Sequence, residues 1–287
     1  MPVCRVPNDP TCPCTRLIGV MSQVLRVQGL RAVRGGKEVF QGLDLVVESG
    51  QRVGVIGPNG VGKSTLAAIL AGRLRPSAGT VEILGMTVGK VDIRRLRSQI
   101  GFFSDDLARQ LVPETTAIEA IAMGKNAGLR AAWFNLPDQD RDDAAELLRL
   151  VDLFEKRESP IAELSSGQRN RILLARAFFG SPRVIVLDEP AAHLDFGARE
   201  DMIASLEALM ARQGGPDALL VVSHHTEEIP ATVSHMLLLG SGYSVFGPKT
   251  EVLNADTVSK VYGRRVALAS LLGRTFAVAE PKLADPL

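Results

Sequence analysis

Cysteine is almost absent from this chain of 287 residues. Its three cysteines, Cys4, Cys12 and Cys14, lie near the N-terminus and none follows them, which suits a reducing compartment. Their spacing matches no ordinary zinc motif, although three close thiols could also serve a metal or a redox partner. Because prolines are interspersed among them, we expect residues 1–22 to form a disordered extension.

An excess of charge of one sign and long apolar runs are missing as well. The net charge is +1, which argues against a nucleic-acid-binding surface. No apolar run approaches the ~18 residues of a transmembrane helix. The apolar stretch over residues 17–21 is also too short for a signal peptide. We therefore expect a globular protein on the cytoplasmic side of the membrane, with no membrane span of its own.

The most informative stretch is glycine-rich and fits the phosphate-binding pattern G-x-x-x-x-G-K-[ST], the P-loop. It consists of Gly57, Pro58, Asn59, Gly60, Val61, Gly62, Lys63, Ser64 and Thr65. A strand predicted over residues 52–56 and a helix over residues 66–71 flank it, so a chance glycine-rich turn is a poor explanation. The backbone N–H groups would surround phosphates, Lys63 would reach the β- and γ-phosphates, and Ser64 would bind Mg²⁺.

A second motif ends in two carboxylates. Residues 184–187 are four branched apolar residues, which predict a strand buried on both faces of a parallel sheet. Asp188 at its tip is placed to hold Mg²⁺, and Glu189 to orient or deprotonate an attacking water. An isolated pair of this kind is usually a solvated strand end, but an upstream P-loop makes it a Walker B motif.

The segment Leu164-Ser165-Ser166-Gly167-Gln168 precedes a helix predicted over residues 169–179, with Ser165 as a suitable N-cap. In this order and spacing it resembles the LSGGQ signature of the ATP-binding-cassette (ABC) ATPases. The resemblance runs from about Val24 to Gly263 and includes the later Leu187-Asp188-Glu189-Pro190. Ser166 stands where that family most often has glycine, and a small residue is kept.

Four further positions follow from this resemblance. Asp195 matches the D-loop, which faces across a dimer, and His224, rather than His225, matches the switch histidine near the γ-phosphate. Two positions depart from the family. Arg34 stands where an aromatic residue usually stacks on adenine, although a guanidinium can also lie flat against a base. Asp105 replaces the glutamine of the Q-loop and is expected to be a metal ligand.

A one-residue shift of the Q-loop is the alternative. It would give the Q-loop role to Ser104 or Asp106 instead of Asp105.

The expected fold is α/β. A P-loop NTPase core with a parallel sheet carries an N-terminal antiparallel β subdomain, with short strands over residues 24–30 and 43–48. A helical subdomain is inserted at about residues 105–163, with a loop around Trp133. The ABC ATPase domain is expected over residues 23–250, ending in a hairpin over residues 235–246. A helical tail is expected over residues 251–287.

The resemblance also implies an activity and partners. It implies an ATPase that uses ATP and Mg²⁺ and dimerises head-to-tail with itself or a related ATPase subunit. Ser165 and the Gly167 N–H of one subunit would then reach the γ-phosphate held by the other. The leading interpretation is a subunit that energises separate membrane-spanning transporter subunits, bound to the inner face of the membrane. Residues 251–263 resemble the tail of ATPases from prokaryotic metal, iron-chelate and oxyanion importers. The alternative is a soluble ABC ATPase acting in assembly or regulation.

Overall fold

The computed structural model describes residues 23–34, 37–126 and 136–281. The cysteine-containing segment and Trp133 lie outside these ranges, and so does the side chain of Arg34. The expectations stated for them therefore stay predictions.

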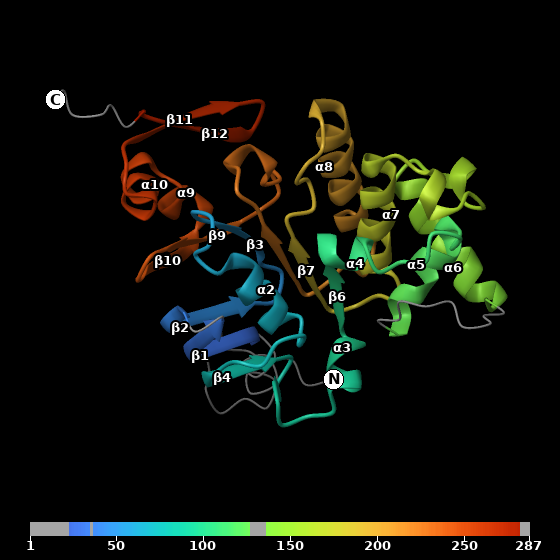
Figure 1. The fold of residues 1–287 in the computed structure, drawn as a ribbon, viewed down its shortest axis with the longest axis horizontal. Helices are drawn as coiled ribbons and strands as arrows, with labels where there is room; N and C mark the ends of the chain where they lie inside the picture. Colours follow the sequence, from blue (N-terminus) through green and yellow to red (C-terminus); the bar gives the residue numbers. More distant parts are fainter. Residues whose placement is uncertain (1–22, 35–36, 127–135, 282–287) are drawn as a thin grey trace, which may run out of the picture.

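A six-stranded sheet occupies the centre of the molecule, in the order β10-β9-β3-β8-β7-β6 (Figure 1). Five strands run parallel, and β10 pairs antiparallel with β9 at one edge. Their bounds are β3 Arg52–Ile56, β6 Ile100–Phe103, β7 Val184–Asp188, β8 Ala218–Val222, β9 His235–Gly240 and β10 Tyr243–Pro248. The continuous apolar runs of β7 and β8 are buried on both faces, as a central parallel strand requires.

The N-terminal subdomain is a separate antiparallel sheet in the order β2-β1-β4-β5. Its strands are β1 Gln23–Arg34, β2 Lys37–Glu48, β4 Ala78–Ile83 and β5 Met86–Thr87. β1 and β2 are longer than expected. Register shifts along their pairing interrupt the simple alternation of apolar and polar residues on which the sequence prediction relied.

Helices lie on both sides of the central sheet, and the helical subdomain projects from the β6 edge (Figure 1). The α-helices up to the C-terminal segment are α2 Lys63–Leu70, α3 Ile93–Arg97, α4 Asp105–Ala108, α5 Ala117–Ala122, α6 Asp138–Leu150, α7 Ser166–Phe178 and α8 Phe196–Met210. Short 3₁₀ turns are η1 Met123–Asn126, η2 Phe154–Lys156, η3 Ile161–Glu163 and η4 Thr226–Glu228. The predicted helical insert is therefore present.

The core divides into two clusters, one on each face of the central sheet. Ile185 and Leu187 belong to the cluster that packs with α5, α6, α7 and α8. Val184 and Val186 belong to the cluster shared with α2 and the antiparallel sheet. Successive residues of one strand thus contribute to different clusters, because side chains alternate across a sheet. The sheet holds the two subdomains together.

The C-terminal segment corrects one expectation. Helices α9 Lys249–Val252 and α10 Ala255–Tyr262 are present, but the chain then forms strands β11 Val266–Leu271 and β12 Arg274–Ala279. They pair as a hairpin whose two turn residues, Leu272 and Gly273, both have positive φ. The expected helical tail is wrong over this part. Leu-Gly lacks the usual Asn-Gly signal of such a turn, so the pattern alone did not reveal it.

Within the described ranges, no helix has both the length and the apolar character needed to cross a bilayer.

Gly101 of β6 provides a test of how closely the helical subdomain packs on the sheet. A Cβ atom there would lie 1.8 Å from the backbone oxygen of Ala177 in α7. We expect Gly101→Ala to lower the free energy of unfolding by about 1–3 kcal/mol, because the added methyl group would force strand β6 away from the backbone of α7. Urea unfolding followed by circular dichroism measures this. Gly215→Ala is the control, since its Cβ would meet only ordinary contacts; an equal loss in both variants would contradict the packing argument.

Candidate active site

The motifs meet at one edge of the central sheet. The P-loop follows β3, Glu189 follows β7, and the switch segment follows β8. These strands are parallel, so their carboxyl ends lie together, which is where α/β folds bind ligands. Segments separated by more than 160 positions in the chain therefore form one site.

The P-loop wraps closely around the beginning of α2. A Cβ atom on Gly57 would lie 2.0 Å from the backbone oxygen of Leu239, so only glycine fits beside β9. Gly60 and Gly62 have φ of 79° and 106°, a region that favours glycine. α2 then begins at Lys63, and its unpaired N-terminal N–H groups suit an anion. The loop has the geometry of a phosphate cradle.

Lys63 lies at the centre of the site and is buried, with only 3% of the residue exposed. Its Nζ donates to the carbonyl oxygens of Gly57 and Pro58 at 2.8 and 3.0 Å. It also lies 2.9 Å from Nδ1 of His224. Burial lowers the pKa of Lys63, while the carboxylates of Glu189 and Asp188 oppose that shift. The ammonium is held by carbonyl dipoles and by two nearby carboxylates.

His224 joins the lysine to the second motif. Its Nδ1 faces the Lys63 ammonium and accepts from it, so the ring proton is on Nε2, which lies 2.5 Å from Oε1 of Glu189. Burial lowers the pKa of His224, and the Lys63 charge lowers it further, whereas Glu189 raises it. The imidazole is therefore neutral at neutral pH. His225 instead lies exposed, 3.8 Å from Glu227.

The backbone at Glu189 is strained. Its φ is 54°, which is unusual for a residue with a side chain. The N–H of Glu189 donates to the carbonyl of Val222 at 3.0 Å, and its own carbonyl accepts from Ala192. This geometry turns the chain sharply at the end of β7 and directs the carboxylate towards His224. Strain of this kind is common at functional sites.

Asp188 is partly buried, and one of its oxygens, Oδ1, has no hydrogen-bond partner. Burial raises its pKa to about 6; a hydrogen bond from Ser64 opposes the shift, and the charges of Glu189 and Asp106 add to it. The Ser64 hydroxyl and the Asp188 carboxylate thus lie together, as the sequence predicted for the two motifs. An unpaired carboxylate oxygen beside a hydroxyl is a donor set that suits a hard divalent cation.

The Q-loop position departs from the expectation. The Asp105 carboxylate pairs with Arg109 one helical turn on, at 2.5 Å, and is half-exposed. Asp106, in contrast, is close enough to act on the pKa of Asp188. Both residues lie in the first turn of α4, and successive helical positions point about 100° apart. The geometry thus favours the one-residue shift to Asp106 over Asp105.

The signature segment begins α7. Ser165 is the N-cap and forms a reciprocal capping box with Gln168, and Ser166 is the first helical residue. Gly167 lies so close to α8 that its Cβ would be 2.8 Å from that of Ala198. Asp195 caps α8 by accepting from Ala198. The signature and the D-loop are therefore adjacent, and Ser165, Ser166 and Asp195 are exposed.

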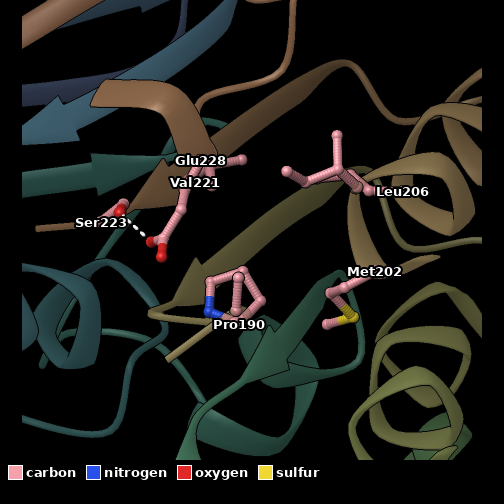
Figure 2. Close-up of a pocket in the computed structure, with 8 residues that line it drawn as sticks. Pro190, Met202, Leu206, Val221, Ser223 and Glu228 are labelled. Atoms are coloured by element: carbon pink, nitrogen blue, oxygen red, sulfur yellow. Dashed lines mark hydrogen bonds between the residues drawn. The ribbon is translucent and has the colours of Figure 1, made fainter. Parts of the chain in front are cut away.

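Two neighbouring contacts were not predicted from the sequence. Buried Glu228 hydrogen-bonds the hydroxyl of Ser223, which also accepts from the His225 N–H at 2.9 Å (Figure 2). Tyr262 of α10 hydrogen-bonds the backbone of Gly57. The Ser223–Glu228 bond is local, five positions apart within the switch segment, whereas the Tyr262–Gly57 contact joins segments far apart in the chain. The first contact stabilises the switch segment, and the second stabilises the start of the P-loop.

A P-loop together with an acidic residue at the end of the next-but-one strand defines the class of the protein, a P-loop nucleoside triphosphatase. Comparison with known proteins narrows this class. The family model described as ABC transporter matches residues 40–192. The hemin import ATP-binding protein HmuV of Rhodococcus jostii is 32% identical over 253 residues, which cover 84% of this chain and 80% of that one. The aliphatic sulfonates import ATP-binding protein SsuB 1 of the same organism is 35% identical over 227 residues, covering 79% and 81%.

A solved structure has the same fold. It is a dimeric, post-hydrolysis ATP-binding cassette bound to ADP and phosphate, with a TM-score of 0.64 and 23% identity, covering 78% of this chain and 98% of that one. The chain belongs to the ABC transporter family. This confirms the predicted fold class and the predicted family, that of the ATP-binding subunits of ABC transporters.

The pKa of Asp188 can be measured directly. We expect its carboxyl to titrate near pH 6 in ¹³C NMR of the protein labelled at aspartate, because burial disfavours its charge. The folded protein then holds this proton up to about pH 6, well above the ordinary range of the group. Asp106→Asn should lower the midpoint by removing a like charge, and Ser64→Ala should raise it.

Asp105→Asn is the matched control for Asp106→Asn and should leave the midpoint unchanged, since Asp105 pairs with Arg109. A larger shift in Asp105→Asn than in Asp106→Asn would return the Q-loop role to Asp105.

Proposed function

We propose that this protein hydrolyses ATP in the presence of Mg²⁺ at the site built around Lys63. The observation that supports it most is the continuous contact from Lys63 through His224 to Glu189. It joins the residue that would bind phosphate to the residue that would act on water. Neither an unrelated buried lysine nor a solvated strand end would need this arrangement.

Ser64 and Asp188 fit a magnesium ion. The Oδ1 atom of Asp188 is buried and unpaired, while the Asp188 carboxyl group also has a hydrogen bond with the Ser64 hydroxyl. Mg²⁺ at this place would neutralise charge on the β- and γ-phosphates. Asp106, whose charge acts on Asp188, would support the metal through water, a role that the sequence analysis assigned to Asp105.

The protein's own residues divide the remaining work. The backbone N–H groups of residues 59–65 orient the phosphates, and Lys63 leaves its carbonyl partners to contact them. Glu189 accepts a proton from, or orients, the attacking water. Neutral His224 donates its Nε2–H to Glu189 and so orients that carboxylate. The contact of Lys63 with Nδ1 fixes the orientation of the imidazole ring. Arg34 remains the proposed contact to the base.

A second copy of the chain completes the site. Within the described structure, the side chains of Ser165 and Gln168 hydrogen-bond each other's backbone N–H, and neither bond reaches the P-loop. Ser165, Ser166 and Gln168 all lie at the start of α7. The first two are exposed beside Asp195, on a surface that another subunit can reach. A head-to-tail dimer would bring this surface to the γ-phosphate bound by the partner's P-loop. The cassette of the same fold that was solved as a dimer supports this assembly.

The dimer would energise separate membrane-spanning subunits from the cytoplasmic face of the membrane. The names of the relatives, which include hemin and sulfonate importers, support import of a small molecule but differ in substrate. A soluble ABC ATPase acting in assembly or regulation is the alternative. Purification from membranes with an affinity tag separates the two: co-purification of a polytopic protein supports transport, and recovery only from the soluble fraction supports the alternative.

Glu189 tests the chemistry. We expect Glu189→Gln to bind ATP with unchanged affinity but to lose about 10²- to 10⁴-fold in turnover, because an amide cannot take the proton of water. Lys63→Ala should instead weaken ATP binding itself. Steady-state phosphate release and calorimetry measure the two effects. Turnover of Glu189→Gln at the rate of the unmodified protein would remove Glu189 from the catalytic role.

The same variant tests assembly. With ATP and Mg²⁺, Glu189→Gln should accumulate as a dimer in size-exclusion chromatography with light scattering, since ATP is bound but not consumed. Adding Ser165→Arg should prevent the dimer by placing a long cation in the contact surface. A Glu189→Gln protein that stayed monomeric at high protein and ATP concentrations would contradict a self-sufficient dimer.

A further inference from the structure

The C-terminal hairpin β11–β12 contacts the catalytic machinery at two points. Strand β12 packs against η4, the turn that follows His224 in the switch segment. At its tip, Arg274 forms two parallel contacts with Glu200 of α8, at 2.8 Å between Nη1 and Oε1 and 2.7 Å between Nη2 and Oε2. Arg274 is only 19% exposed in its side chain. A two-contact, partly buried pair of this kind has a fixed geometry, unlike an ordinary surface ion pair.

The partner helix α8 begins at the D-loop. Asp195 is its N-cap, and Glu200 follows within the first two turns. The residue beside Glu200, Arg199, faces buried Glu228 of η4 at 4.0 Å. Adjacent residues of α8 thus contact the switch segment directly and the hairpin that packs on it.

Apolar packing anchors α8 from Met202 onwards, whereas its first turns, residues 196–201, bury no side chain. A small cavity lies between α8 and the end of β8, lined by Met202 and Leu206 on one side and by Val221, Ser223 and Glu228 on the other (Figure 2). The charged pairs at Arg199 and Glu200 therefore join the turns of α8 next to the D-loop, which core packing does not hold, to the switch segment and the hairpin.

We propose that Arg274 and Glu200 are a positioning pair that fixes the D-loop helix against the switch segment, so that the C-terminal hairpin takes part in ATP hydrolysis. Both residues lie outside the P-loop, the tip of β7 and the switch segment. It acts through α8 on Asp195 and through β12 on the segment that carries His224. Its kinetic consequence depends on the hydrolysis proposed above, whereas its structural consequence does not.

The chain provides a matched control. Arg265 and Glu280 form another arginine–glutamate pair at the open end of the same hairpin, 3.9 Å apart, with side chains 85% and 64% exposed. It shares chemistry and hairpin with Arg274–Glu200, but neither residue has a charged partner on α8 or η4 among the described residues. A general effect of weakening the hairpin would appear in both pairs.

The kinetic test compares Arg274→Ala with Arg265→Ala. We expect Arg274→Ala to lower kcat by about 3- to 30-fold with ATP affinity unchanged within about twofold, and Arg265→Ala to change neither. Glu200→Gln, which leaves the hairpin sequence intact, should reproduce the loss if Arg274→Ala folds poorly. Arg274→Glu combined with Glu200→Arg should recover more kcat than either single exchange. Equal effects of Arg274→Ala and Arg265→Ala, or a loss in ATP affinity alone, would overturn the proposal.

Hydrogen exchange tests the positioning without relying on hydrolysis. We expect the amides of residues 195–200 and 224–229 to exchange faster in Arg274→Ala and Glu200→Gln than in the unmodified protein. In Arg265→Ala their exchange rates should not change. Unchanged exchange of both segments would overturn the proposal even if kcat fell. If the unmodified protein hydrolysed no ATP, the proposed function would fail, while the exchange data would still decide whether the pair positions these segments.

Discussion

The burial of the Lys63 ammonium is the constraint on which the rest of the site depends. Because only 3% of the Lys63 residue is exposed, its ammonium requires polar partners from the protein itself. Two come from the P-loop itself, as the carbonyls of Gly57 and Pro58. The others, His224 and the nearby carboxylates, come from strands β8 and β7. Only a parallel sheet whose strands end at the same edge brings these three segments together, so the fold and the charge state of one side chain are linked.

Much of the site could be predicted because its signals are local. The P-loop glycines, the acidic tip of β7 and the cap at Ser165 are each encoded within a few residues, and each motif is followed or preceded by the element that its pattern predicts. Glycine at position 57 is needed because β9 passes against it, yet the motif identified it without knowledge of β9. Local chemistry here coincides with tertiary demand.

The parts that could not be predicted depend on direction or on distant partners. Asp105 and Asp106 are neighbours in sequence and equally acidic, and only the rotation of α4 decides which one acts on Asp188. The contact between Lys63 and His224 joins residues 161 positions apart. The hairpin after Tyr262 turns at Leu272 and Gly273, which do not form a familiar turn sequence. In each case the deciding energy comes from packing between elements, not from the segment itself.

The exposed tip of that hairpin also has a practical value. Leu272 is 93% exposed at the turn, next to Arg274, and all three cysteines of the chain lie among its first fourteen residues. Once those three are replaced, a single cysteine at position 272 would carry one fluorescent dye without competing thiols. Because Arg274 beside the turn is hydrogen-bonded to Glu200 of the D-loop helix, the dye would report on the position of that helix in the proposed dimer. With one dye on each subunit, fluorescence energy transfer between the two turns could follow opening and closing of the proposed dimer in single molecules.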